Sequence, residues 1–164
     1  MTEEKDREAA AEMNTFLQHH ALDQAKKDIS KTFVVRGPHS DDPQRVIAYY
    51  TTTVGHLQPR QLPKVVSEQM TIPIVFLLRL AVDNAFQRKK IGSKLLVYFL
   101  IRMVQVAQDT GVYALVLEPL NERVRGFYER FGLRPLPGES NQMVLRIKDI
   151  RAWLVAHGHI QPIA

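Results

Sequence analysis

The sequence contains no cysteine among its 164 residues. Disulfides and thiolate metal sites are therefore excluded, and the reducing cytoplasm is the expected compartment. The six histidines form no i,i+4 pair and have no associated carboxylate pattern, so no metal site is expected.

Acidic residues are scarce in one stretch of a chain whose net charge is +5. Between Arg79 and Lys94 there are five cations against one acid, Asp83. The first twelve residues show the reverse, with five acids and two bases. The positive charge is thus concentrated in one segment, where it would suit an anionic ligand.

Long apolar runs and repeats are also missing. The N-terminal stretch MTEEKDREAAAEM is acidic and polar, unlike a signal peptide, and we expect no later segment to span a bilayer. Hydrophobic residues make up 45% and charged residues 24%, as in ordinary globular proteins. We therefore expect one domain over residues 1–164, with no membrane partner.

The residues that are present indicate alternating helices and strands. IVFLLRLAV (74–82) is apolar almost throughout, as in a central strand, and the proline-containing stretch 55–73 is expected to be a connection. Asn121 and Gly132 suit the N-cap and C-cap of a short helix. We expect helices within 5–27 and at 91–109, 121–132 and 149–158, and strands at 32–35, 45–54, 74–82, 113–119 and 143–147. This order predicts an α/β (α+β) fold with one mixed sheet and helices on both faces.

The stretch QRKKIGS (87–93) lies between the expected central strand and the long helix that follows it. Free N–H groups and the positive dipole end of that helix would point at the turn. Three cations and Gly92, which permits close backbone approach, would make a pyrophosphate a suitable guest. The alternative is an ordinary solvated basic loop.

Three segments carry a resemblance to a known family. They are RLAVD (79–83), Gln87 to Gly92, and FYERFGL (127–133). Together they resemble the GNAT family of N-acetyltransferases, most closely its bacterial toxins that acetylate aminoacyl-tRNA. One position departs from the pattern, because Lys90 stands where the family has the first glycine of its turn. Lysine lacks the conformational freedom of glycine but adds a charge that could reach a phosphate.

The resemblance implies a largely antiparallel sheet with a V-shaped split between its central strands, and acetyl-CoA as acetyl donor. The backbone of Leu80, Ala81 and Val82 would pair with the pantetheine arm, which Asn121 would also contact. The pyrophosphate would lie on the turn and helix start, formed by Arg88, Lys89, Lys90, Ile91, Gly92 and Ser93.

The resemblance also makes Tyr128 the acid that protonates the leaving thiolate. A tyrosine of pKa ~10 donating to a thiolate whose acid has pKa ~8.5 is uphill by about 1.5 units, a gap that a modest environmental shift would close. An α-amine acceptor of pKa roughly 8 needs no strong base. The alternative is that Tyr128 is simply a core aromatic.

Several arginines are candidates for substrate binding. Arg79, inside an apolar strand, could pair with a buried acid or meet the RNA end. Arg123 and Arg125 lie on the same expected short helix as Tyr128 and could steer acceptor phosphates, or be solvated surface. The helix at 91–109 carries more apolar residues than one stripe uses. The N-terminal helices could cover the remainder, or the remainder could form a subunit or antitoxin contact.

Three functional hypotheses follow. The first is a toxin of a type II toxin–antitoxin system that acetylates aminoacyl-tRNA and blocks translation, with a ribbon-helix-helix antitoxin and a homodimer implied by the resemblance. The second is an N-acetyltransferase acting on a small-molecule or protein amine. The third is a catalytically silent module that binds tRNA or a protein, which Lys90 would permit.

Overall fold

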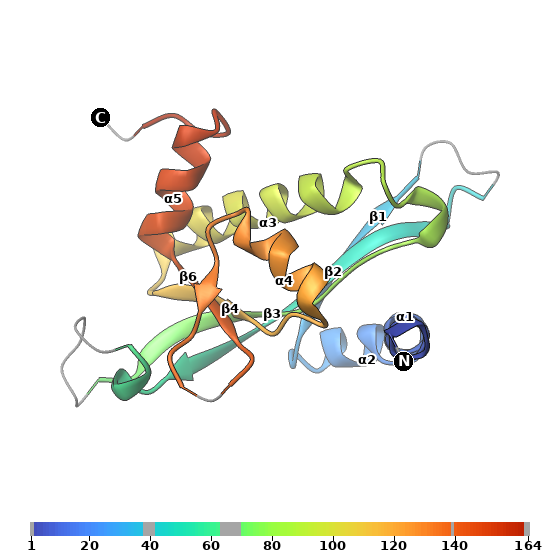
Figure 1. The fold of residues 1–164 in the computed structure, drawn as a ribbon, viewed down its shortest axis with the longest axis horizontal. Helices are drawn as coiled ribbons and strands as arrows, with labels where there is room; N and C mark the ends of the chain where they lie inside the picture. The colour runs from blue at the N-terminus through green and yellow to red at the C-terminus, as the bar shows by residue number, and fades with distance from the viewer. Residues whose placement is uncertain (1, 38–41, 63–69, 139, 163–164) are drawn as a thin grey trace. The chain divides into compact units, whose positions relative to one another are not determined.

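The structure is a computed structural model that describes residues 2–37, 42–62, 70–138 and 140–162. The helices are α1 (Thr2–His19), α2 (Ala21–Lys26), α3 (Ile91–Asp109), α4 (Glu122–Glu129) and α5 (Ile147–Ala156), with short 3-10 turns at Pro59–Gln61 and Asn84–Phe86. The strands are β1 (Lys31–Arg36), β2 (Val46–Leu57), β3 (Ile72–Val82), β4 (Ala114–Leu117), β5 (Arg134–Pro135) and β6 (Met143–Arg146) (Figure 1).

The strands form one six-stranded mixed sheet in the order β1-β2-β3-β4-β6-β5. The β1–β2, β4–β6 and β5–β6 pairs are antiparallel, whereas β3 and β4 are parallel. The β3–β4 ladder joins Ile74–Leu77 to Ala114–Leu117, and β3 runs on to Val82 past the end of β4. The mixed sheet, and a central strand that leaves its partner, confirm the predicted fold class.

Some expected boundaries were wrong. β2 continues to Leu57, three residues into the expected connection, and β5 was not predicted at all because a two-residue strand has no periodicity. Helix α4 ends at Glu129 with Arg130 as C-cap, so Gly132 is not the cap residue, although it does have a positive φ of 93°. The middle of the expected connection, 63–69, lies outside the described residues.

The chain forms two compact units, each with its own apolar cluster. Unit 1 comprises Met1–Thr53 and Leu78–Leu95. In it, one face of α1 packs on the sheet: Phe16 joins Tyr49 in a buried cluster, and the Tyr49 hydroxyl donates to the carbonyl of Met13 at 2.8 Å. Amphipathic α1 is therefore held by its apolar face, as helix periodicity requires.

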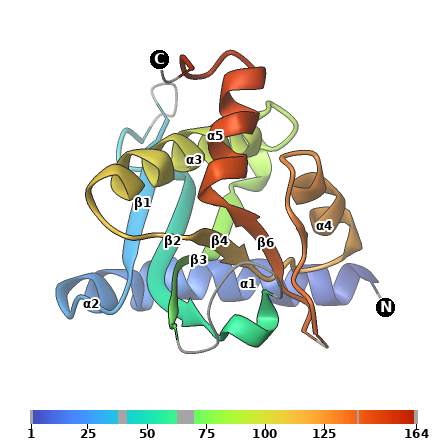
Figure 2. The ribbon, with the colours of Figure 1, turned by 90° about the vertical axis from the view of Figure 1, so that its left-hand side faces the viewer.

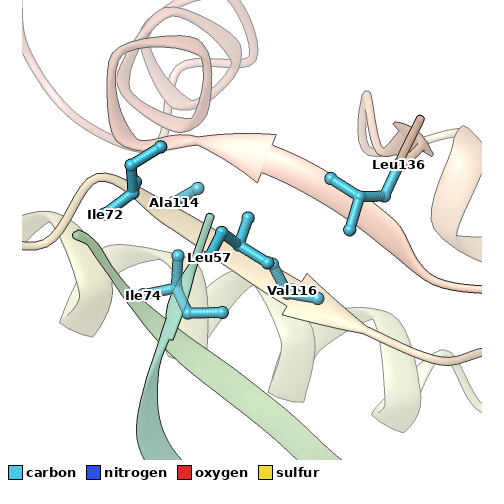
Figure 3. Close-up of a cluster of buried hydrophobic side chains, with 6 residues drawn as sticks. All are labelled: Leu57, Ile72, Ile74, Ala114, Val116 and Leu136. Atoms are coloured by element: carbon cyan, nitrogen blue, oxygen red, sulfur yellow. The ribbon is translucent and has the colours of Figure 1, made fainter. Parts of the chain in front are cut away.

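Unit 2 comprises Val54–Leu77 and Leu96–Ala164. All four residues of β4 are buried, as expected of a central strand. Figure 3 shows the adjoining cluster, to which β2, β3, β4 and the segment after β5 contribute Leu57, Ile72, Ile74, Ala114, Val116 and Leu136. Strand β6 passes directly into α5 (Figure 2). The organisation of 1–164 as a single domain stays a prediction.

Helix α3 corrects one expectation. By length and composition alone it could cross a membrane, which the sequence analysis did not anticipate. Its Leu96 and Leu100 are fully buried, however, and Val104 is nearly so, as in the core helix of a globular fold. Much of the apolar surplus predicted for this helix is thus used internally, while Tyr98 and Val106 remain exposed.

Candidate active site

The cationic turn begins where β3 ends. Gln87, the first residue of the turn, is tied back to the strand: its side-chain Nε2 donates to the carbonyl of Val82 and to Oδ1 of Asn84, both at 3.0 Å. The carbonyl of Lys90 then accepts from the amide of Lys94 at 3.0 Å, which starts α3. The structure therefore confirms the predicted strand–turn–helix arrangement, with the first amides of α3 directly after the cations.

Two cations of the turn have left-handed backbone conformations. Arg88 has φ 65° and Lys90 has φ 59°, values that favour glycine over residues with a Cβ. Lys90 is thus at a position where the resemblance expects glycine and where the backbone adopts the matching conformation. Its side chain, like those of Arg88 and Lys89, is exposed. The turn keeps the shape that glycine would provide and gains a cation.

Gly92 has a different role from the turn residues before it. A Cβ built there would meet Cγ2 of Val82 at 3.6 Å, an ordinary contact, and its φ is not positive. Neither packing nor backbone conformation within the protein therefore requires glycine at this place. A ligand that approaches the first amides of α3 would require it, since a methyl group would stand in the way.

The end of β3 presents two faces. Ala81 packs against the cluster of Phe16 and Tyr49, whereas Val82 faces Gly92. Leu80 is half-buried. Beyond the β3–β4 ladder, the backbone from Leu78 onward has no β4 partner within the described sheet, which is the condition for pairing with an extended ligand.

Arg79 has structural contacts, but its acidic partner is not the buried acid that the sequence suggested, because the Glu12 side chain is 73% exposed. Its guanidinium lies 3.8 Å from the centroid of the Phe16 ring, and Nη2 is 3.6 Å from Oε1 of Glu12. A cation–π contact and an ion pair thus hold it against α1. Contact between Arg79 and RNA stays a prediction.

Helix α4 carries the remaining predicted residues and belongs to unit 2. Asn121 is its N-cap, as predicted, with Oδ1 accepting from the amide of Val124 at 2.9 Å. Arg125 is only 17% exposed and binds the backbone carbonyl and side chain of Asn141, while Arg123 is exposed. Of the two arginines, only Arg123 lies open on the surface.

Tyr128 is buried, with 6% of its surface exposed. Its ring meets that of Phe127 edge-on at 5.2 Å, and Phe127 in turn contacts Phe131 at 5.2 Å. Burial raises the pKa of Tyr128 well above the ordinary value of about 10. This shift is opposite to the one expected to ease proton transfer. Burial therefore favours the neutral, protonated form of the Tyr128 phenol.

No group of three or more His, Asp or Glu side chains that could hold a metal ion occurs in the described parts of the chain. The groups suited to a ligand are instead amides, cations and a phenol. Strand β3 leads through a cationic turn into the long helix α3, and its parallel ladder with β4 stops before β3 itself ends. This arrangement defines an α/β protein that is suited to binding a carrier molecule with phosphate groups.

Comparison with known proteins identifies that carrier. The sequence matches the acetyltransferase (GNAT) family over residues 8–133. A tRNA-acetylating toxin of Mycobacterium tuberculosis is 33% identical over 112 residues, which are 67% of this chain and 68% of the relative. The chain belongs to the acetyltransferase (GNAT) family. It is therefore an N-acetyltransferase that uses acetyl-CoA, as predicted.

Two solved structures are similar over most of the fold. AtaT complexed with acetyl-methionyl-tRNAfMet is 27% identical, with a TM-score of 0.76 over 87% of this chain and 85% of that one. A tyrosine-to-phenylalanine mutant of the AtaT toxin, bound to the C-terminus of the antitoxin AtaR and acetyl-CoA, is 27% identical. Its TM-score is 0.70 over 85% of this chain and 81% of that one.

The residues present fit acetyl-CoA. Gly92 leaves the first amides of α3 open to a pyrophosphate, and three exposed cations precede it. What sequence reasoning missed is a contact just before the turn, between Arg45 and Asp83, which are 38 residues apart and for which no local pattern gives a signal.

Proposed function

We propose that this chain is a toxin that acetylates the α-amino group of aminoacyl-tRNA and thereby blocks translation. The single observation that carries the proposal is the strand–turn–helix at residues 78–95, an anion site with exposed cations and an open helix start. The similar toxins supply the acceptor class, since one acetylates tRNA and another was solved with acetyl-methionyl-tRNAfMet.

The chain's own residues suit this reaction. The amides of Arg88 to Ser93 would bind the pyrophosphate, and the backbone of Leu80 to Val82 would hold the pantetheine arm. When bound, acetyl-CoA supplies an activated acetyl group. The neutral α-amine forms a bond to the acetyl carbon while the carbon–sulfur bond breaks, and Tyr128 Oη–H donates a hydrogen bond to the departing sulfur. The amine nitrogen releases its proton to solvent, and the departing thiolate takes up a proton to become the free thiol of coenzyme A.

Two arguments favour aminoacyl-tRNA as the acceptor: the comparisons, and the fact that an α-amine can react without a strong base. An α-amine of pKa roughly 8 is partly neutral at pH 7, whereas a lysine ε-amine of pKa ~10.4 needs a base. No carboxylate stands out in the sequence as such a base. This favours aminoacyl-tRNA over a protein lysine.

We also propose a cytoplasmic location, a homodimer and a ribbon-helix-helix antitoxin. The absence of cysteine supports the first. The exposed Tyr98 and Val106 of α3 offer surface for a second subunit. A similar toxin is bound by an antitoxin, which supports a partner of this class.

The first experiment is calorimetric titration of the purified protein with acetyl-CoA, for which we expect a Kd in the micromolar range, on the order of −8 kcal/mol. Incubation with acetyl-CoA and aminoacylated tRNA should then give acetylated aminoacyl-tRNA. Uncharged tRNA and free amino acids serve as controls. Equal acetylation of free amines would favour the small-molecule hypothesis, and absence of acetyl-CoA binding by folded protein would leave only the silent module.

A further inference from the structure

Asp83, the first residue after β3, joins two strands of unit 1. Its amide donates to the carbonyl of Ile47 in β2 at 2.8 Å. Its Oδ1 accepts from the amide of Ala85 at 2.8 Å, and its Oδ2 accepts from Arg45 at 2.7 Å (Nη2) and 3.2 Å (Nε). Arg45 immediately precedes β2, so one carboxylate connects the start of β2 to the exit of β3.

Arg45 also reaches the far end of the short turn that Asp83 caps. Its guanidinium lies 5.6 Å from the centroid of the Phe86 ring, and Nζ of Lys89 lies 5.3 Å from the same centroid. Arg45 therefore contacts both the residue before this turn and its last residue. The next residue, Gln87, begins the segment that is expected to bind the pyrophosphate, and its side chain donates to the carbonyl of Val82.

That segment needs external support. Arg88 and Lys90 both have left-handed backbone conformations, which residues with a Cβ disfavour. Such a conformation persists only when surrounding contacts impose it. The contacts that lead into the segment are those of Gln87 with Val82 and those of Arg45 with Asp83 and Phe86.

We propose that Arg45 is a positioning residue for acetyl-CoA, which acts through Asp83 and Phe86 to hold the turn at residues 87–93 in its anion-binding shape. The proposal rests on the proposed function only in requiring that this turn binds acetyl-CoA. Two other roles are possible for an arginine that is 46% exposed: a surface ion pair with no effect on the ligand, or a direct contact with a phosphate.

The geometry separates these roles. Arg45 presents two nitrogens to one carboxylate oxygen, an arrangement that a lysine ammonium cannot reproduce. If Arg45 acts through Asp83, then Arg45→Lys fails to restore binding and Asp83→Asn has the same effect as Arg45→Ala. If Arg45 contacts phosphate directly, Arg45→Lys retains most of the affinity and Asp83→Asn does not reduce it.

The test measures acetyl-CoA affinity by calorimetry, and KM and kcat separately, in Arg45→Ala, Asp83→Asn and the double variant. We expect each single change to raise Kd and KM for acetyl-CoA about tenfold, with kcat within about twofold. The double variant should be no worse than either single one, because both remove the same contact. Asp83→Asn is nearly isosteric and keeps the test valid if Arg45→Ala does not fold.

The matched control is Arg146→Ala, which breaks another Arg–Asp pair of 2.7 Å, with Asp149 in unit 2, and should leave Kd unchanged. An unchanged Kd in the Arg45 and Asp83 variants would overturn the proposal, as would additive effects in the double variant or full affinity in Arg45→Lys. A wild-type protein that binds no acetyl-CoA would instead overturn the proposed function, and the inference with it.

Discussion

In the turn at residues 87–93 the cations are exposed and two of them have left-handed backbone conformations, whereas in α4 the candidate catalytic residue, Tyr128, is buried and the helix is regular. The turn offers backbone amides, in a shape set by the left-handed conformations of Arg88 and Lys90. Helix α4 offers one hydroxyl, placed by aromatic packing and an Asn121 cap. In the proposed function, ligand binding therefore depends on backbone shape in the turn, and catalysis depends on one side chain in α4.

The largest effect is expected in α4. Tyr128→Phe should lower kcat about 10²- to 10⁴-fold, because the hydrogen-bond donor to the sulfur is lost. The melting temperature should change little, since the ring that packs on Phe127 is retained. Measurement of kcat and of thermal unfolding checks both parts, with Tyr98→Phe as the control because Tyr98 is exposed on α3. Undiminished transfer would show that Tyr128 is only a core aromatic.

The same residue predicts a pH dependence. Because burial raises the pKa of Tyr128, the hydroxyl stays protonated through and beyond the ordinary value of about 10. The kcat profile should therefore show no falling limb from this group below about pH 10. The free energy of unfolding should also fall at high pH. The stabilisation from burying the neutral Tyr128 phenol is complete below about pH 10 and is lost as the pH rises through its raised pKa.

A second comparison uses one substitution in both regions. Gly92→Ala should weaken acetyl-CoA binding about tenfold, since the added methyl group stands at the open helix start. Stability should not fall, and could rise by up to about 1 kcal/mol, because alanine is the better helix former and its Cβ meets only Val82.

Gly126→Ala is the matched change in α4, where a Cβ meets nothing within 4 Å. It should give the gain in stability without the loss of affinity. Calorimetry measures the acetyl-CoA affinity of both variants, and chemical denaturation measures their free energies of unfolding. Equal acetyl-CoA affinity in Gly92→Ala and wild type would show that no ligand approaches this end of α3.

The smallest effect is expected for Lys90→Gly. Glycine adopts a φ of 59° without a Cβ penalty, so stability should rise by about 1 kcal/mol, or roughly 2–4 °C in melting temperature. Acetyl-CoA affinity should change by less than about tenfold, because the backbone already has the shape that glycine would adopt.

Asp28→Gly is the control for Lys90→Gly, with a φ of 57° at the end of α2. Its gain should be smaller, since aspartate tolerates this conformation better than lysine, and its acetyl-CoA affinity should equal that of wild type. Should wild type fail to bind acetyl-CoA while Lys90→Gly binds it, Lys90 disables the turn and the silent-module hypothesis is correct.

Local patterns were sufficient for most of the fold. The apolar run at 74–82 and the helix at 91–109 were predicted within two residues of their observed bounds, because periodicity and length determine such elements. The Asn121 cap was predicted from its position before a helix. β5 and the end of β2 were missed because pairing with another strand, rather than local sequence, defines them.

The sequence by itself determined the family, the cationic turn and the identity of the candidate acid, since each depends on residue types at short spacing. The tertiary structure decided how these residues are held and tuned. Arg79 lies on Phe16 and Arg45 binds Asp83 because strands and helices distant in sequence meet. The pKa of Tyr128 rises because α4 buries it. Burial and long-range contact depend on the whole packed chain, and no short segment specifies them.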